Sequence, residues 1–190
     1  MFLALFVGIV LELGYFNFFT IYNIVHPQIE ESQYTLSQMQ FQNWNKQGNI
    51  LVSETDPALI ITGVNLFVNT IDLRFDTSSS IDSIVLFYIN DEHPQITEQT
   101  MVHLSGPLEK KCRVRIDATV KDLRIDLGDA AGTQLRDFTV TINSKAFDIS
   151  FSRIIAVVLI YLAGAFLFRI QKMPDYKLEE IQQKKEFSDE

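Results

Sequence analysis

The sequence predicts a mainly β protein, namely an extracytoplasmic, jelly-roll-like β-sandwich flanked by two transmembrane α-helices. Two long apolar segments, residues 2–22 and 149–168, enclose a stretch of short apolar alternations from 49 to 152. About 20 apolar residues suffice for a helix to cross a bilayer, whereas alternation with a period of two is typical of half-buried strands. The 190-residue chain therefore has room for one soluble domain between two spans.

The first apolar segment could be a retained transmembrane helix or a cleaved signal peptide. A signal peptide usually has a basic start and small residues at its cleavage site, and neither occurs here. The second half of the segment is instead rich in aromatic residues, which gather at membrane–water interfaces. We therefore expect a retained span whose interfacial belt is formed by Tyr15, Phe16, Phe18, Phe19 and Tyr22.

The charges beside the second apolar segment predict the orientation of the chain. Arg169 and Lys172 follow this segment, and basic residues favour the cytoplasmic side, although Arg153 precedes it. Both termini are then cytoplasmic, and the β domain lies on the cell surface or in the periplasm. The expected regions are a first transmembrane helix (1–23), a polar connector (24–48), the β-sandwich domain (49–152), a second transmembrane helix (153–170) and a cytoplasmic tail (171–190).

Glu12 lies within the first apolar segment and needs a partner, because a carboxylate is costly inside a membrane. One interpretation keeps Glu12 protonated, or pairs it with Asn17 or with a polar group of another helix. The other makes Glu12 and Asn17 intramembrane contacts to a neighbouring polytopic subunit, or to a lipid headgroup. Arg153 is expected to lie too near the outer boundary to reach Glu12, since about ten helical residues at 1.5 Å each separate Glu12 from that boundary.

Between the two apolar segments, short apolar alternations recur at regular spacing and are separated by turn residues. Turns are expected at 55–57 and near 118–119, and an alternating patch at 36–41 could form an additional first strand. Short strands in such number, without helical periodicity, indicate a sandwich or jelly roll. The expected strands are 49–53, 58–62, 69–75, 84–89, 100–104, 111–116, 121–127, 138–142 and 146–151.

The overall composition narrows the class of partner. The net charge is −8, and residues 23–152 hold 10 Lys and Arg against 17 Asp and Glu. Such a surface repels polyphosphate, so no nucleic-acid partner is expected. Cys112 is the single cysteine, so the chain can form no internal disulfide, and a small disulfide-built scaffold is excluded.

The sequence contains no recognisable catalytic constellation. A Gly-rich phosphate loop, a metal-spaced His/Cys cluster and a nucleophile elbow are all missing, so we assign no catalytic residue, cofactor or metal. Among the seventeen acids of residues 23–152, no hydrolase pair stands out. The acidic loops at Asp91-Glu92 and Asp129 could hold calcium, which takes oxygen ligands, but their spacing matches no known calcium loop.

Alternating charges on the two strands expected at 111–116 and 121–127 suggest a binding surface. If these strands form a hairpin, opposite charges could simply pair across it and stabilise it by about 0.2–1 kcal/mol each. The alternative is a polar groove for a glycan, in which Arg and Asp side chains bond to sugar hydroxyls. The residues concerned are Arg113, Arg115 and Arg124, with Asp117, Asp122 and Asp126.

Trp44 is the second candidate for glycan binding. It is the only tryptophan of the chain and lies among the polar residues 43–46. A lone Trp in a polar stretch either packs down onto the core or lies open as a stacking platform for a sugar. The first interpretation is favoured, and the second keeps Trp44 among the candidate site residues.

Three motifs carry a resemblance to a known group of proteins. Glu12 precedes Phe16-Asn17-Phe18 in the first span, Thr55-Asp56-Pro57 precedes a strand, and Leu-Arg-Ile-Asp-Leu-Gly at 123–128 precedes a segment that re-enters the membrane near Arg153. With these motifs, most of residues 2–170 resembles the N-terminal unit of bacterial multi-pass envelope proteins such as GT-C-type polysaccharide glycosyltransferases. That unit consists of a span, a β-sandwich and a span. The chain departs from the pattern in stopping after two spans.

The resemblance implies a non-enzymatic accessory subunit of bacterial cell-envelope polysaccharide synthesis, modification or export. The sandwich would bind glycan, or a polytopic glycosyltransferase or transporter, or both. An alternative function is a structural assembly or sensor subunit of another membrane complex. A hydrolase or transferase that acts on envelope sugars is the third hypothesis.

Overall fold

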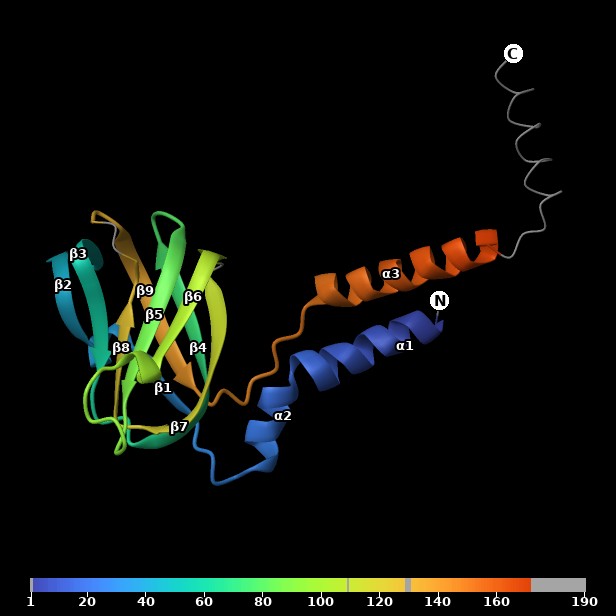
Figure 1. Cartoon of the computed structure of the whole chain (residues 1–190). Helices are drawn as coiled ribbons and strands as arrows, with labels where there is room; N and C mark the ends of the chain where they lie inside the picture. The colour runs from blue at the N-terminus through green and yellow to red at the C-terminus, as the bar shows by residue number, and fades with distance from the viewer. Residues whose placement is uncertain (1, 109, 129–130, 172–190) are drawn as a thin grey trace, which may run out of the picture. The chain divides into compact units, whose positions relative to one another are not determined.

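The computed structural model describes residues 2–108, 110–128 and 131–171. The expected cytoplasmic tail therefore lies outside the described residues from position 172 onward. The chain forms two compact units (Figure 1). A β unit is formed by residues 19–146, and a helical unit is formed by the two ends of the chain, up to Phe18 and from Phe147.

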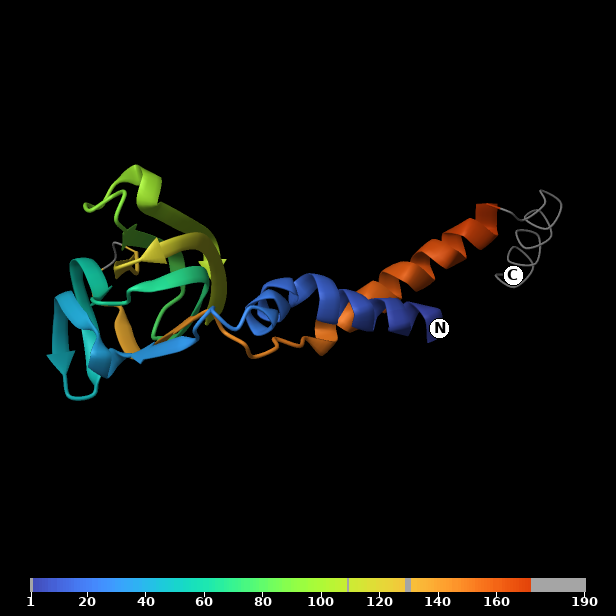
Figure 2. The ribbon, with the colours of Figure 1, turned by 90° about the horizontal axis from the view of Figure 1, so that it is seen from below.

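In the described residues, nine antiparallel strands form the β unit and pack as two layers (Figures 1 and 2). The strand order is β6-β5-β8-β3-β9-β4-β7, with β1 beside β9 and β2 beside β3. β3 takes part in both layers, because residues 58–61 pair with β8 whereas Leu51 and Val52 pair with β9. The strands are β1 (Ser32–Thr35), β2 (Gln40–Gln47), β3 (Ile50–Ile61), β4 (Leu66–Thr77), β5 (Ile81–Ile89), β6 (Met101–Leu108), β7 (Lys111–Val120), β8 (Asp122–Asp126) and β9 (Gln134–Ile142), with short 3₁₀ turns η2 (Leu36–Gln38) and η3 (Glu98–Thr100).

Alternating apolar side chains fill the core between the layers. On β4 the alternate residues Ile71, Leu73 and Phe75 are buried, as are Leu123 and Ile125 on β8. They belong to one cluster that includes buried residues from most of the other strands. Burying a Leu, Ile or Phe side chain contributes about 1.5–3 kcal/mol relative to leaving it exposed. The predicted mainly β sandwich is therefore confirmed, and the pattern that predicted its strands also explains why they pack.

The expected turn at 55–57 is wrong, because β3 runs through it as one strand. A bulge interrupts the pairing there, where Asn43 of β2 stands opposite residues 54–57 of β3. Asn43 and Asp56 have φ angles of 58° and 55°, and Asn43 Nδ2 donates to the Asp56 carbonyl oxygen at 2.9 Å. Asn and Asp enter this left-handed region more readily than most residues, so the strand bends without ending.

β7 and β8 do not form the expected hairpin with a turn at 118–119. β7 continues past Asp117, whose φ is 62°, as far as Val120 and pairs with β4, whereas β8 pairs with β3 and β5. Lys121 lies between them and donates its backbone N–H to the Ile89 carbonyl oxygen at 2.7 Å. The chain therefore passes from one layer to the other at this point.

The edges of the β unit also differ from the expectation. β1 and β2 lie within the stretch 24–48, which was expected to be a connector, and β1 pairs with β9 so that Ser32 stands opposite Ile142. The chain thus enters and leaves the β unit on neighbouring strands. The strand expected at 146–151 is absent from these described residues, because Phe147 and Ile149 are about half exposed and do not face the core.

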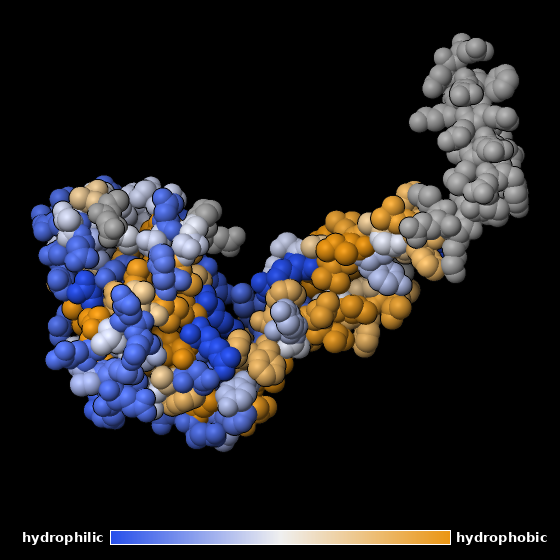
Figure 3. All heavy atoms as spheres, viewed as in Figure 1, coloured by the Kyte–Doolittle hydropathy of each residue, from blue (hydrophilic) through white to orange (hydrophobic). Residues whose placement is uncertain are grey.

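The helical unit contains two helices that pack closely. α1 (Phe2–Val10) continues into a wider π-helical turn, η1 (Leu11–Phe16), and α3 (Phe151–Gln171) follows the β unit. A Cβ atom added at Gly8 of α1 would lie 3.3 Å from Ile154 Cγ2 of α3. Small residues allow helix backbones to approach in this way. In Figure 3 apolar residues cover α1 and α3.

The first apolar segment is not one continuous helix. It is interrupted at Asn17 (φ −108°, ψ 19°), after which α2 (Phe18–Val25) begins. By length and composition, Phe151–Arg169 of α3 could cross a membrane. The first segment passes the same test only when Phe2–Phe16 and Phe18–Val25 are taken together as one broken span.

Candidate functional site

A pocket of about 220 Å³ lies on the outer face of β3, β8 and β5. Arg124 of β8 stands opposite Ile60 of β3 on one side and opposite Phe87 of β5 on the other. Because side chains alternate along a strand, these three residues share the outer face, while Ile125, the next residue of β8, is buried in the core. The pocket is lined by Ile60, Thr62, Phe87, Ile89, Ile96, Asp122, Leu123 and Arg124.

Arg124 is the cation of this pocket and is held by two carboxylates. Its Nε donates to Asp126 Oδ1 at 2.7 Å, and its Nη2 lies 3.5 Å from Asp56 Oδ2. The hydrogen bond to Asp126, with the charges of both acids, raises the pKa of Arg124 above its usual value although burial opposes it. The side chain is 23% exposed. A guanidinium has five N–H donors, so it can bond to a ligand while it remains paired.

The edge of the pocket is fixed by polar contacts. Asp122 Oδ1 accepts the backbone N–H of Gly63 at 2.8 Å, where Gly63 adopts a φ of 72°. The loop that carries Ile96 is folded on itself, because the His93 backbone N–H donates to Asn90 Oδ1 at 2.6 Å. The pocket therefore combines apolar walls with one guanidinium and acidic oxygens in fixed positions.

The structure separates the four residues proposed to bind glycan. Arg124 lines the pocket, whereas Arg113 and Arg115 lie on β7 in the other layer and take no part in it. Arg113 forms an ion pair with its cross-strand neighbour Asp72, with Nη2 to Oδ2 at 2.7 Å. Arg115 bonds Asp117 two residues along its own strand at 2.7 Å. Arg113 and Arg115 therefore pair with acids on β4 and β7. They do not pair across a hairpin of the strands expected at 111–116 and 121–127.

Trp44 lies on β2 and packs against the core cluster. Its indole Nε1 is buried and has no hydrogen-bond partner among the described residues. The contact with the core agrees with the interpretation of Trp44 as a packed side chain. A larger pocket of about 430 Å³ lies next to this region and is lined by Leu36, Ser37, Met39, Phe41, Lys46, Asn49 and Leu51.

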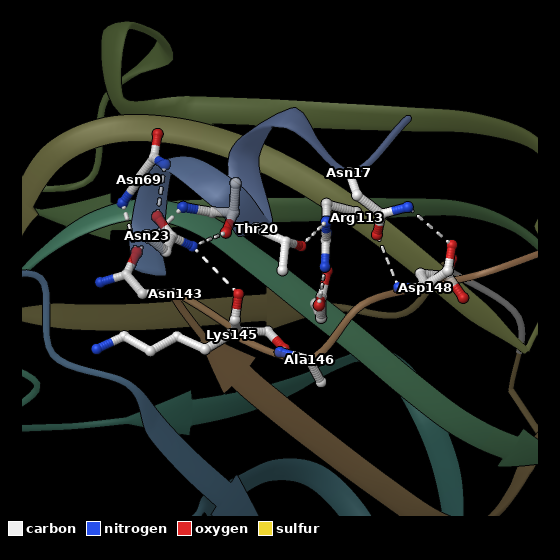
Figure 4. Close-up of polar contacts among 12 residues, drawn as sticks. Asn17, Thr20, Asn23, Asn69, Arg113, Asn143, Lys145, Ala146 and Asp148 are labelled. Atoms are coloured by element: carbon white, nitrogen blue, oxygen red, sulfur yellow. Dashed lines mark hydrogen bonds and ion pairs between the residues drawn. The ribbon is translucent and has the colours of Figure 1, made fainter. Parts of the chain in front are cut away.

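Buried asparagines form a second polar cluster in the β unit, shown in Figure 4, that the sequence analysis missed. Asn69 Nδ2 donates to Asn23 Oδ1 at 2.7 Å, and Asn23 Nδ2 donates to Thr70 Oγ1 and to the Ser144 carbonyl oxygen at 3.3 Å each. Asn143, with a φ of 54°, accepts the backbone N–H of Asn69 at 2.8 Å. Asn69 lies in β4 and Asn143 directly follows β9, next to apolar strand residues, whereas Asn23 lies in α2.

Glu12 and Asn17 are satisfied within the helical unit. The Arg153 guanidinium bonds Glu12 through Nε to Oε2 at 2.9 Å, and Asn17 Nδ2 donates to the Glu12 carbonyl oxygen at 2.7 Å. The expectation that Arg153 cannot reach Glu12 is therefore wrong. The first helix ends at Asn17 and not near Tyr22, so Glu12 lies close to its end, where α3 begins. Asn17 also accepts the backbone N–H of Asp148 at 2.7 Å (Figure 4).

The acidic loops proposed to hold calcium do not form a cluster of metal ligands in the part of the chain that the structure describes. No group of three or more His, Cys, Asp or Glu there could hold a metal ion. Asp91 instead forms an ion pair with Lys121. Asp129 lies outside the described residues.

No known protein family and no curated protein matches the chain. Among solved structures, a low-affinity xylan-binding module of Roseburia intestinalis is 14% identical, with a TM-score of 0.40 over 65% of this chain and 98% of that one. The glycosylation-associated protein complex of Streptococcus agalactiae is 17% identical, with a TM-score of 0.39 over 59% and 25%. A CBM35 module of Paenibacillus barcinonensis is 13% identical, with a TM-score of 0.35 over 57% and 97%. At these TM-scores the likenesses assign no ligand or role to this chain.

Proposed function

We propose that this protein is a non-enzymatic, membrane-anchored accessory subunit of bacterial cell-envelope polysaccharide synthesis, modification or export, and that its sandwich binds glycan. The observation that supports glycan binding is the pocket on β3, β8 and β5, where Arg124 is set between Ile60 and Phe87. The anchoring and the accessory role rest on the apolar helices and on the sequence motifs.

The chemistry of the pocket fits a sugar ring. A pyranose has apolar C–H faces and a rim of hydroxyls, so it needs an aromatic or aliphatic surface next to directed donors and acceptors. Phe87 and Ile60 supply the surface, Arg124 supplies N–H donors, and Asp122 supplies carboxylate oxygen. Because Arg124 is already paired with two acids, the pocket gives no excess positive charge, which favours neutral glycans over uronates and phosphates.

The proposed anchor consists of α3 and the first apolar segment. α3 offers 19 residues, Phe151–Arg169, that could span a bilayer, and Arg169 is placed for a cytoplasmic boundary. With both helices as spans, both termini are cytoplasmic and the sandwich is extracytoplasmic. A polytopic glycosyltransferase or transporter is the proposed membrane partner. A glycan-binding subunit without enzymatic activity needs such a partner to carry out the synthesis or export of the polysaccharide.

The glycan hypothesis is tested with the full chain in lipid nanodiscs on an array of neutral and acidic bacterial envelope oligosaccharides. The strongest neutral binder is then titrated calorimetrically against Phe87→Ala and Arg124→Met. We expect each variant to weaken binding at least about tenfold, as the loss of one stacked ring or one charge-assisted hydrogen bond implies. Arg136→Met, at an exposed position on β9, is the matched control and should bind normally.

A silent array would remove glycan binding from the proposal. Loss of binding in Phe41→Ala but not in Phe87→Ala would move the site to the larger pocket beside β2. Glycan silence combined with stable co-purification of a polytopic membrane protein would select the alternative function, a structural assembly or sensor subunit.

A further inference from the structure

α2 has its polar residues on the inside and its apolar residues on the outside. Thr20 and Asn23 are completely buried, whereas Phe18, Tyr22 and Val25 are 55%, 37% and 61% exposed. The exposed three follow the spacing i, i+4, i+7, which places them along one side of a helix. A surface helix of a soluble protein has the opposite arrangement, with its apolar side facing the core.

The inner side of α2 is bonded to the sheet of the β unit. Asn23 accepts one hydrogen bond from Asn69 and donates to Thr70 and to the backbone of Ser144 (Figure 4). Thr20 Oγ1 accepts Arg113 Nη1 at 3.0 Å. Buried polar groups with several satisfied bonds allow little rotation, so this side of α2 cannot turn outward, and the apolar side stays exposed.

The charged side chain of Arg113 bridges α2 and the sheet. Its guanidinium bonds Asp72 of β4 as well as Thr20, and the Asp72 side chain is only 8% exposed. The guanidinium of Arg115 lies over the Phe19 ring, 5.2 Å from its centroid. The Arg115 side chain is 57% exposed and places a cation beside the apolar side of α2.

These features fit a lipid surface better than water. Helices that lie in a membrane interface bury a Phe- or Leu-rich side among the headgroups and place Arg or Lys beside it. Tyrosine is enriched at the same depth, and Tyr22 is one of the three exposed residues. α2 forms the last part of the first apolar segment and follows η1 after Asn17, so in the proposed anchor it lies where this broken span leaves the bilayer.

We propose that the outer side of α2, formed by Phe18, Tyr22 and Val25, rests at the headgroup–acyl boundary of the membrane. The proposal places α2, which is hydrogen-bonded to the sheet of the β unit, at the lipid surface. This inference rests on the membrane anchoring of the proposed function and is independent of glycan binding.

The test measures how deeply α2 enters lipid in the full chain. Trp44→Phe gives a background without tryptophan, into which one reporter is introduced by Val25→Trp, by Phe41→Trp as a control on exposed β2, or by Leu159→Trp as a control on α3. Each protein is reconstituted alone into nanodiscs whose phospholipids are brominated near the glycerol end of the acyl chains. We expect the Val25→Trp reporter to be quenched at least about threefold more than the Phe41→Trp reporter, and iodide in the buffer to quench the two in the reverse order.

The controls separate the possible failures. Quenching of the Leu159→Trp reporter with an unquenched Val25→Trp reporter would leave the anchor intact and overturn the inference. A Val25→Trp reporter shielded from both iodide and bromine would show that protein covers α2, which also overturns it. If no reporter is quenched by brominated lipid, membrane anchoring falls together with the inference, whereas glycan binding is decided by its own titration.

Discussion

Glu12 and Arg153 form a two-contact ion pair although 141 residues separate them in sequence. Glu12 is 1% exposed, and a further hydrogen bond reaches its Oε1 from the Ser150 backbone N–H at 2.7 Å. The carboxylate within the first apolar segment is therefore satisfied by the chain itself. The hypothesis that Glu12 contacts another subunit is not needed to explain it.

Removing one partner of this pair should destabilise the helical unit. Arg153→Met leaves the buried Glu12 carboxylate with the Ser150 hydrogen bond but without a counter-charge. Breaking a fully buried pair typically costs about 3–5 kcal/mol, and the 35% exposure of the Arg153 side chain makes this an upper value. The double variant Glu12→Leu/Arg153→Met should regain most of the loss, since no charge remains. Titration of the full chain with SDS, followed by far-UV circular dichroism, measures both. Equal stability of the three proteins would mean that the pair contributes nothing.

Asn143 should be one of the most sensitive positions of the β unit. Its side chain accepts the backbone N–H of Thr70 at 3.2 Å and donates to the carbonyl oxygens of Glu30 and Phe67 at 3.0 and 2.7 Å. Asn143→Ala loses these bonds and keeps a φ of 54°, so we expect a loss of about 2–4 kcal/mol. Urea denaturation followed by Trp44 fluorescence provides the measurement.

Asn143→Gly is the matched control, because glycine adopts positive φ without strain. It should lose the hydrogen bonds but remain about 1 kcal/mol more stable than the Ala variant, which carries the additional left-handed penalty. If the Gly variant were as stable as the natural protein, the bonds would be without effect.

Cys112 should make the β unit sensitive to alkaline pH. Burial, and to a smaller extent the charge of Asp72, raises the pKa of the thiol from 9.0 to about 11. The folded state therefore favours the neutral thiol. Its stabilising contribution is fully present below pH 9 and decreases between pH 9 and 11, because only the unfolded chain ionises there. The full rise in pKa from 9.0 to about 11 corresponds to about 2.7 kcal/mol, and solvent screening of this partly exposed side chain reduces the expected loss below that value. Cys112→Ala should show a smaller loss over this range.

The same shift predicts slow alkylation of Cys112. Thiolate is the reactive species, so the rate of reaction with iodoacetamide should rise with a midpoint near pH 11 in the folded protein and near pH 9 in urea. A midpoint near pH 9 in both would contradict the burial of this thiol.

Trp44→Phe should leave both folding and glycan binding nearly unchanged. The indole packs on the core but its Nε1 has no partner among the described residues, so phenylalanine keeps most of the contact and removes an unsatisfied donor. We expect a change within about 1 kcal/mol, against about 3 kcal/mol or more for Trp44→Ala. Thermal unfolding by circular dichroism gives the values. A large loss of glycan binding in Trp44→Phe would restore the stacking interpretation.

The period-two pattern was sufficient to predict the class of the fold. In the strand expected at 69–75, the alternate apolar residues Ile71, Leu73 and Phe75 are buried, as period-two alternation indicates. The pairing of the strands is harder to predict from the sequence than their existence. Asp56 resembles a turn residue because its type tolerates positive φ, and the same property allows a bulge inside β3. Local sequence cannot distinguish a turn from a bulge, since pairing with the neighbouring strand β2 determines which of them forms.

Only part of the candidate site could be foreseen. The alternation of Arg124 with acids marks it as a candidate in the sequence, and Arg124 lines the pocket. Ile60 and Phe87 come from other strands, and only the strand order places them beside Arg124. Arg113 shows the same pattern in sequence and lies in the other layer. The pairing of Glu12 with Arg153 was missed because the break at Asn17 shortens the first helix.

The adjacency of β1 and β9 brings the two ends of the strand region close together. Because Ser32 and Ile142 are paired neighbours, the points of entry and exit could be bridged by a tight loop after excision of everything between them. A graft into an unrelated host would have to include α2 and Asn143 as well, because Asn23 of α2 and Asn143 are buried and bonded to β4.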